Sequence, residues 1–282
     1  MTPRRETLFQ LFKYLVYSLL AVNVYVFLRE EYLAALIEFP GGVPFGDIID
    51  AYATTIDTAA WLVLLLMFEL ETYVLGPRHS TPPAVTRTLH GLRIASYVFI
   101  VYAFYGYTLN AVDTYDVAVV AGLDDLCTLA GNAWMYAVDY DEYVAITAAN
   151  CADLSPAGSF LRFAELPAVV DAAGLGHIRL LAWADASNAL VWILIVVILE
   201  IEVRLQEHDR LTDAAVRVMG VIKVVFYSIL FLLAIYWGFD GDFVDFWDAF
   251  LWLVAFFFIE LNVIEWRHEE DAEDSAPAVT SA

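Results

Sequence analysis

The sequence predicts an all-α membrane protein in which six transmembrane helices form three two-helix repeats in a pseudo-threefold bundle, with an extracytoplasmic cap inserted between helices 3 and 4. Three observations predict this fold class: long apolar blocks, a residue pattern that recurs along them, and one polar insertion. Hydrophobic residues make up 61% of the 282 residues. A soluble domain of this length could not bury so much apolar surface, so the blocks are predicted to lie in a bilayer.

The apolar blocks divide into six windows, each close to the ~20 residues that cross a bilayer core. They lie at Leu8–Leu28, Thr58–Leu75, Leu92–Leu109, Leu180–Ile201, Val218–Trp237 and Phe246–Ile264. Because the number of crossings is even, both termini are predicted on the same side of the membrane.

The basic residues predict which side that is, because Lys and Arg accumulate on cytoplasmic flanks. With the N-terminus inside, only Arg29, Arg162 and Arg179 of the 14 basic residues lie outside. The sequence therefore predicts a multi-pass protein of a bacterial-type inner (plasma) membrane, with N- and C-termini cytoplasmic and the lipid bilayer as its first partner.

The net charge of −22 comes from 36 acidic residues against 14 basic ones. Such a chain repels a phosphate backbone, so no nucleic-acid partner is expected. Most of the carboxylates fall on the predicted outer side, where they would concentrate cations near the surface. A solvated acidic coat explains the same distribution without any role in binding.

The segment between the third and fourth spans is polar and contains the only two cysteines of the chain, Cys127 and Cys151. Both lie in the predicted oxidising compartment, which favours a disulfide over two free thiols. The chain is accordingly divided as follows: 1–76, first hairpin repeat; 77–110, third transmembrane helix; 111–179, extracytoplasmic cap; 180–206, fourth transmembrane helix; 207–268, third hairpin repeat; 269–282, disordered acidic cytoplasmic tail.

An internal repeat is the most informative pattern in the chain. The even spans share four positions: Asp57-x3-Trp61-x7-Glu69-x-Glu71, Asn188-x3-Trp192-x7-Glu200-x-Glu202 and Asp248-x3-Trp252-x7-Glu260-x-Asn262. The odd spans share a shorter one: Lys13-x3-Tyr17, Arg93-x3-Tyr97 and Lys223-x3-Tyr227. All three hairpins run in the same sense, so they are predicted to be parallel repeats about an axis along the membrane normal.

Each repeat brings a basic odd helix beside an acidic even helix. At 1.5 Å per residue, the charges reach equal depth in three predicted ion pairs, with the tyrosines one turn above the bases and able to donate to the same carboxylates. The pairs are Lys13 with Glu69, Arg93 with Glu200, and Lys223 with Glu260; the tyrosines are Tyr17, Tyr97 and Tyr227. Such buried pairs either serve a function or only specify which helices pack together.

The functional interpretation is a cation pathway along the repeat axis. Asp57, Asn188 and Asp248 would form an outer ring and Glu69, Glu200 and Glu260 an inner ring, about 18 Å apart along the helices. Acidic rings select cations in channels. We therefore expect a channel or transporter for a small cation; the alternative is a non-catalytic accessory or scaffold subunit that docks on other membrane-complex subunits through its cap.

Enzymatic chemistry is not expected. The five histidines all fall in loops or tails, so haem held by two imidazoles inside the membrane is excluded. The sequence contains no zinc-protease, phosphate-loop or nucleophile-elbow motif. We predict no catalytic residue, no metal site and no cofactor.

Overall fold

The computed structural model describes residues 3–70, 82–139, 142–155, 158–163, 166–208 and 210–274. Side chains are described in these ranges except at 3–6, 50, 203, 206, 207 and 260–274. All structural statements below concern these residues.

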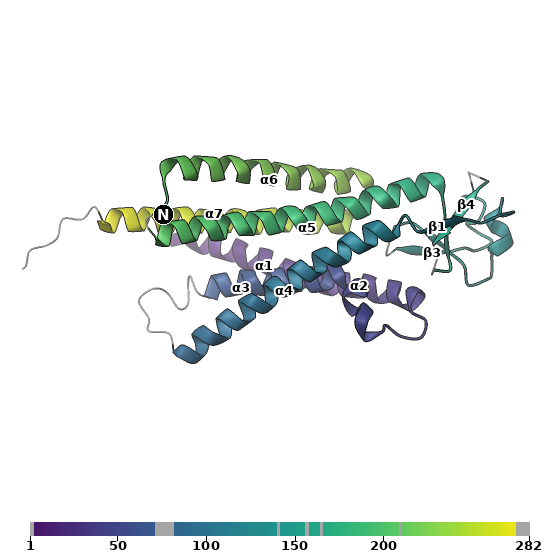
Figure 1. Ribbon diagram of the computed structural model, residues 1–282, viewed down its shortest axis with the longest axis horizontal. Coiled ribbons are helices and arrows are strands. Elements are labelled where there is room, and N and C mark those ends of the chain that lie inside the picture. The colour runs from purple at the N-terminus through teal and green to yellow at the C-terminus, as the bar shows by residue number, and fades with distance from the viewer. Residues whose placement is uncertain are drawn as a thin grey trace, which may run out of the picture. The chain divides into compact units, whose positions relative to one another are not determined.

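Long helices make up most of the described chain (Figure 1). They are α1 (Pro3–Glu38), α3 (Ala53–Glu69), α4 (Pro83–Asp113), α5 (Ala172–Glu207), α6 (Asp213–Asp240) and α7 (Phe243–Asp274), with the short η1 (Phe45–Asp47) and α2 (Ile48–Ala51) before α3. Each predicted span falls in one of the long helices, although the second span continues past Leu70 into residues outside the described ranges. The helix α7 extends into the segment predicted as a tail, of which 275–282 are also outside them.

Four of these helices are long and apolar enough to cross a membrane, which is consistent with a membrane protein. Their candidate spans are Thr7–Glu38, Pro83–Asp113, Ala172–Glu202 and Asp213–Asp240. The second and sixth crossings stay predictions, because α3 is described over 17 residues and the side chains of α7 only up to Ile259.

The prediction of an all-α chain is wrong for the insertion, which contains a five-stranded sheet. The strands are β1 (Val117–Val119), β2 (Met135–Ala137), β3 (Tyr143–Ala145), β4 (Phe160–Phe163) and β5 (Ala168–Asp171), in the order β1-β4-β5-β2-β3. The pair β2 and β5 is parallel and the other pairs are antiparallel. Strands of three or four residues are too short to show an alternating sequence pattern, so they could not be recognised from the sequence.

Both faces of this sheet are covered, and every residue of the central strand β5 is buried. One face packs on a cluster that includes Leu126, Ile146 and Cys151. The other face packs on Leu175 and Ile178 of α5. The first turns of α5 therefore form part of the core of the sheet domain, which we define as residues 114–171 together with these turns.

The predicted disulfide between Cys127 and Cys151 is confirmed. It joins the 3-10 helix at Leu126–Leu129 to the segment after β3, at the edge of the first core. Because both half-cystines belong to one small domain, the cross-link restricts the unfolded state of that domain.

The junction between β5 and α5 is tight. The Asp171 side chain accepts a hydrogen bond from the Gly174 amide at 2.6 Å and so caps the first turn of α5. A Cβ at Gly174 would lie 2.7 Å from Val170 Cγ2 and 3.2 Å from the Tyr136 hydroxyl, so only glycine fits there. Burial, together with the neighbouring Asp171 carboxylate, raises the pKa of Tyr136.

The sheet domain is fixed to the helices at two further points. The Tyr143 hydroxyl donates to Glu38 Oε1, at the end of α1, at 2.8 Å. On α5, the Arg179 guanidinium donates to the Thr114 carbonyl at 3.2 and 3.3 Å and lies 4.2 Å from the ring centroid of Tyr115. The first contact joins the end of α1 to β3, and the second joins α5 to the residues that follow α4.

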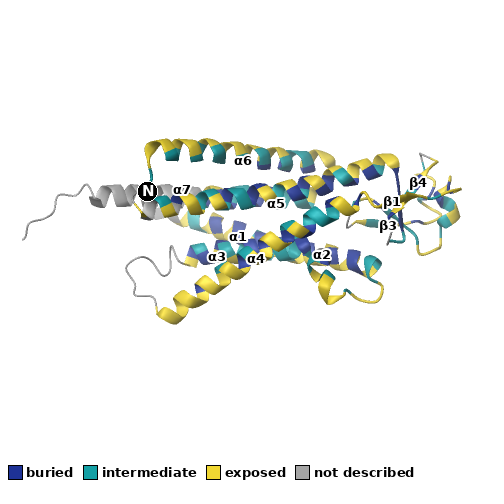
Figure 2. Ribbon diagram, in the orientation of Figure 1, coloured by how far each residue is buried: buried dark blue, intermediate teal, exposed yellow. Residues whose placement is uncertain are grey.

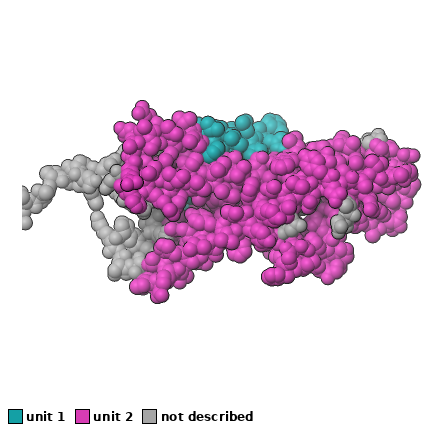
Figure 3. Space-filling view, in the orientation of Figure 1, with its two compact units in different colours: residues 1–22, 224–282 teal, residues 23–223 magenta. Residues whose placement is uncertain are grey.

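The chain divides into two compact units, shown in separate colours in Figure 3. Unit 1 is residues 1–22 with 224–282, and unit 2 is residues 23–223. In unit 1, the ring of Phe258 on α7 makes edge contacts with Phe9 and Phe12 of α1 at 5.1 and 5.6 Å. Unit 2 holds the C-terminal half of α1, the helices α2 to α5, the sheet domain and the first turns of α6. The threefold arrangement of hairpins stays a prediction.

Loss of the disulfide should weaken the sheet domain. In the double variant Cys127→Ala, Cys151→Ala, we expect the free energy of unfolding of this domain to fall by ~3 kcal/mol, the usual effect for a loop of this length. Limited proteolysis at increasing temperature measures the change. Reductant should lower the unfolding midpoint of the wild type and leave that of the variant unchanged; equal midpoints for reduced and oxidised wild type would contradict the prediction.

Tyr136 should make the sheet domain sensitive to alkali. Its pKa is raised in the folded state, so its contribution to stability is fully present below the unfolded value of ~10 and is lost as pH rises through the raised folded value. We expect Tyr136→Phe to lessen the fall in the unfolding midpoint between about pH 8 and about pH 11. An unchanged alkaline profile in this variant would show that other tyrosines or lysines determine it.

Candidate functional site

Helix α3 begins at an interruption that a carboxylate from another helix stabilises. Glu31 of α1 accepts hydrogen bonds from the backbone amides of Thr54 and Thr55, at 2.7 Å to Oε1 and 3.0 Å to Oε2. The residue before α3, Tyr52, provides no side-chain cap of its own. Glu31 is only 5% exposed, so this is a buried carboxylate held against the positive end of a helix.

Three acidic side chains from three helices interact electrostatically with one tyrosine near this point. The Tyr107 side chain of α4 is hydrogen-bonded to that of Thr54 and lies within electrostatic range of Asp57 on α3, Glu31 on α1 and Asp185 on α5. We call Glu31, Asp57, Asp185 and Tyr107 the outer polar cluster. The sequence pattern predicted Asp57 in a site of this kind but gave no sign of the other three members.

Asn188, the counterpart of Asp57 in the second repeat, lies one turn beyond Asp185 on α5. Its Oδ1 atom is buried and has no hydrogen-bond partner among the described residues. An unsatisfied buried acceptor is costly in an apolar interior. The Asn188 side chain adds a further acceptor to α5, the helix that contributes Asp185 to the outer polar cluster.

The repeated tryptophans of the first two copies meet inside unit 2. The rings of Trp61 and Trp192 have centroids 6.3 Å apart, and the residues are 8% and 6% exposed. In each helix the tryptophan lies four residues, about 6 Å, from the repeated polar position before it. The two indoles therefore form a buried aromatic layer one turn along the helices from Asp57 and Asn188.

A second polar level lies beyond the tryptophans. Lys223 of α6 forms an ion pair with Glu202 of α5, with Nζ 3.1 Å from Oε2 and side chains 13% and 6% exposed. Glu69, at the end of α3, is 7% exposed. We call Glu69, Glu202 and Lys223 the inner polar level. It lies about 12 to 15 Å along the helices from the tryptophans.

In the second repeat, two carboxylates of α5 make different contacts. Glu200 forms a salt bridge with Arg204 one turn further along α5, at 2.9 Å, and these side chains are 46% and 70% exposed. Glu202, two residues on, has the buried position and contacts Lys223. The side chain of Glu260 is outside the described ones, so its pairing with Lys223 stays a prediction, as does that of Arg93 with Glu200.

The remaining predicted residues occupy helices in both units. In unit 1, Lys13 is fully buried, with Nζ 5.3 Å from the ring centroid of Tyr14, and Tyr17 is 5% exposed. Asp248 on α7 is partly buried. Two of the repeated tyrosines are also partly buried: Tyr97 on α4 and Tyr227 on α6. The pairing of Lys13 with Glu69 stays a prediction.

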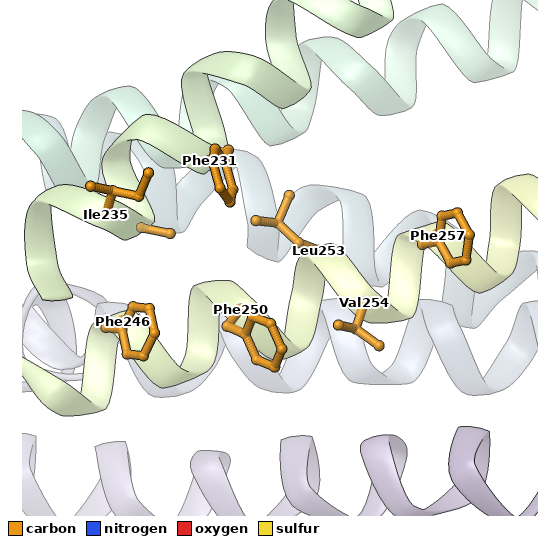
Figure 4. A pocket seen from close by; sticks show the side chains of 8 residues that line it. Phe231, Ile235, Phe246, Phe250, Leu253, Val254 and Phe257 are labelled. Atoms are coloured by element: carbon orange, nitrogen blue, oxygen red, sulfur yellow. The ribbon is translucent and has the colours of Figure 1, made fainter.

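An apolar pocket of about 220 Å³ lies between α6 and α7 in unit 1 (Figure 4). The aromatic rings of Phe231, Phe246, Phe250 and Phe257 line it, together with aliphatic side chains. Hydrophobic side chains also cover much of the outward surface of α6, which Figure 2 shows mostly exposed. A surface of this kind suits contact with lipid or with another apolar helix.

No group of three or more His, Cys, Asp or Glu side chains in the described part of the chain is placed to hold a metal ion. Comparison of the chain with protein-family models, with curated proteins and with solved structures finds no match.

The buried pair of Glu202 and Lys223 should behave differently from the exposed pair of Glu200 and Arg204. Removal of one charge, as in Glu202→Gln, leaves the other buried and should cost about 3 kcal/mol of stability in detergent. The double variant Glu202→Gln, Lys223→Met should recover most of this loss, because no charge is then left buried.

The matched control is Glu200→Gln on the same helix. Because its salt bridge is exposed, the loss should stay below about 1 kcal/mol. Thermal unfolding of the wild type and the three variants measures these differences. A similar loss for Glu200→Gln and Glu202→Gln would show that the difference in burial has no energetic effect.

Proposed function

We propose that the protein is a multi-pass membrane protein that moves a small cation, and that its route passes through the interior of unit 2. The observation that carries this proposal is the outer polar cluster, in which Glu31, Asp57 and Asp185 from three helices interact electrostatically with Tyr107. Ionisable side chains inside membrane helices are costly to insert and mark ion or proton pathways in many membrane proteins.

Two levels of polar side chains support a route rather than an isolated site. The helices α3 and α5 each contribute a carboxylate to both levels, Asp57 and Glu69 on α3 and Asp185 and Glu202 on α5. The buried pair of Trp61 and Trp192 lies between them along these helices. Aromatic and apolar constrictions close the pathways of channels by excluding water. In this proposal the indole layer is the closed barrier, and a cation passes only when α3 and α5 move apart there.

The roles follow from position and charge. Asp57, with Asn188 beside it on α5, receives the cation from the outer side. Glu69 and Glu202 receive it at the inner level, where the Lys223 ammonium offsets part of their negative charge and weakens retention. By the repeat, we propose Asp248 and Glu260 as the corresponding residues of the third hairpin, Lys13 and Arg93 as the bases of the first and second hairpins, and a pseudo-threefold arrangement of the three hairpins.

An accessory subunit of a larger membrane complex is the second candidate. It is favoured by the apolar surface of α6, since only 11% of the residues in its most apolar window are buried. Lipid covers such a surface in an isolated protein, and a neighbouring subunit covers it in a complex. The sheet domain, with exposed Asp116, Asp124, Asp125 and Glu142, would then be a docking surface on the outer side.

Cation flux into proteoliposomes of purified protein tests the proposal. Wild-type protein should carry protons or monovalent cations, and Asp57→Asn should reduce the flux about tenfold or more, the effect of only ~1.4 kcal/mol at the barrier. The matched control is Asp116→Asn, which removes an exposed carboxylate from the sheet domain and should leave the flux within about twofold of wild type.

Two results would contradict transport. One is the absence of flux from folded wild-type protein; the other is equal flux for wild type and Asp57→Asn. If flux is absent and partner proteins co-purify with the wild type but not with a chain lacking residues 116–169, the accessory role is supported instead.

A further inference from the structure

We infer that Glu31 is a proton-sensitive latch on α3: the ionised carboxylate holds the first turn of this helix, and protonation releases it. The inference deepens the proposed function, because α3 carries Asp57 and Trp61. The latch can nevertheless be tested without any measurement of transport.

An interruption of the helix precedes α3. The short helix α2 ends at Ala51, and Tyr52 leaves the helical conformation with φ −135° and ψ 34° before α3 begins at Ala53. An α-helix leaves its first amides without partners inside the helix, so a new helix start in an apolar interior needs outside acceptors. Tyr52 has no side-chain oxygen in position to act as that acceptor.

Glu31 of α1 supplies the hydrogen-bond acceptors that the first turn of α3 needs. Its two carboxylate oxygens take separate amides, those of Thr54 and Thr55, at 2.7 and 3.0 Å. Both bonds are charge-assisted, and the negative charge faces the positive end of α3. The sequence separation of more than twenty residues makes this a tertiary contact that joins α1 to α3.

Protonation weakens this arrangement in two ways. A protonated carboxyl group has one oxygen that carries hydrogen and becomes a donor, so it no longer offers two equivalent acceptors to two amides. The attraction between the negative charge and the helix dipole is lost at the same time. The direct effect is on the cap of α3, because Glu31 accepts from the amides of its first turn.

Three other ionisable groups lie in the interior of unit 2 together with Glu31. They are Asp57 on α3, Tyr107 on α4 and Asp185 on α5, and each of the three carboxylates interacts electrostatically with the Tyr107 hydroxyl. Because all three carboxyl groups carry the same sign of charge, uptake of a proton by one relieves repulsion on the others. Arrival of a proton or cation at Asp57 is thereby coupled to the state of the latch.

Release of the first turn would move the residues that the proposed route depends on. Asp57 lies in the second turn of α3, two residues after Thr55, and Trp61 follows one turn later. Detachment from α1 frees this end of α3 to move relative to α5, where Trp192 is the partner of Trp61. The latch therefore links the protonation state of the outer side to the closed aromatic layer.

Hydrogen–deuterium exchange of the full chain in detergent micelles, followed by mass spectrometry, tests the latch. We compare peptides that cover the first turns of α3 between about pH 4 and about pH 8, after correction for the intrinsic pH dependence of exchange. In the wild type, exchange of these amides should accelerate about tenfold toward low pH, as expected for loss of a charged helix cap. In Glu31→Gln it should be fast at every pH.

The matched control is Glu30→Gln, which removes the adjacent, exposed carboxylate of the same helix and should retain the wild-type profile. Wild-type protection of α3 that does not change with pH would overturn the inference. So would a Glu31→Gln profile that still follows the wild type, since another group would then be responsible. The wild-type profile needs no substitution, so it decides the question even if a variant folds poorly.

The latch and the transport function can fail separately. A pH-dependent first turn of α3 in a protein without flux would preserve the latch and remove the proposed function. Flux without any pH-dependent exchange at α3 would preserve the function and remove the latch.

Discussion

The structure depends on one constraint: polar groups inside apolar helices need partners. Unit 2 meets it in three different ways. Glu202 is matched by an ammonium group from α6, Glu31 is matched by two backbone amides of α3, and Asp57 and Asp185 interact electrostatically with the Tyr107 hydroxyl. Each solution joins two or more helices, so the polar groups also define which helices pack together. The same residues can therefore specify helix packing and line a cation pathway. The two interpretations of the buried polar groups do not exclude each other.

Some of this organisation was predictable from the sequence. The apolar windows located the helices because a continuous apolar stretch of ~20 residues is a strong signal. The disulfide was predictable because the only two cysteines lie in one insertion. The five-stranded sheet was not, because its strands are very short and two of its pairings, β2 with β5 and β1 with β4, join distant segments. Such pairings leave no local pattern in the sequence.

The polar site shows the same division between local and tertiary information. The repeat placed Trp61 and Trp192 in matching positions, and the structure adds that their rings meet in unit 2. The sequence placed Glu200 in the inner ring, but the structure buries Glu202 instead. Residues two apart on a helix point in nearly opposite directions, and only the neighbouring helices decide which one is buried. Glu31 was missed because its partners are backbone amides, which every residue except proline possesses.

The direct connection of β5 to α5 has a mechanical consequence. The strand ends at Asp171 and the helix begins at Ala172, with no intervening linker and with the first turns of the helix packed into the sheet domain. Asp185 lies about 20 Å further along the same rod. A force or a ligand that tilts the folded domain at one end of this rod tilts the acidic residue at the other. A movement of the insertion is thus transmitted along α5 into the apolar interior.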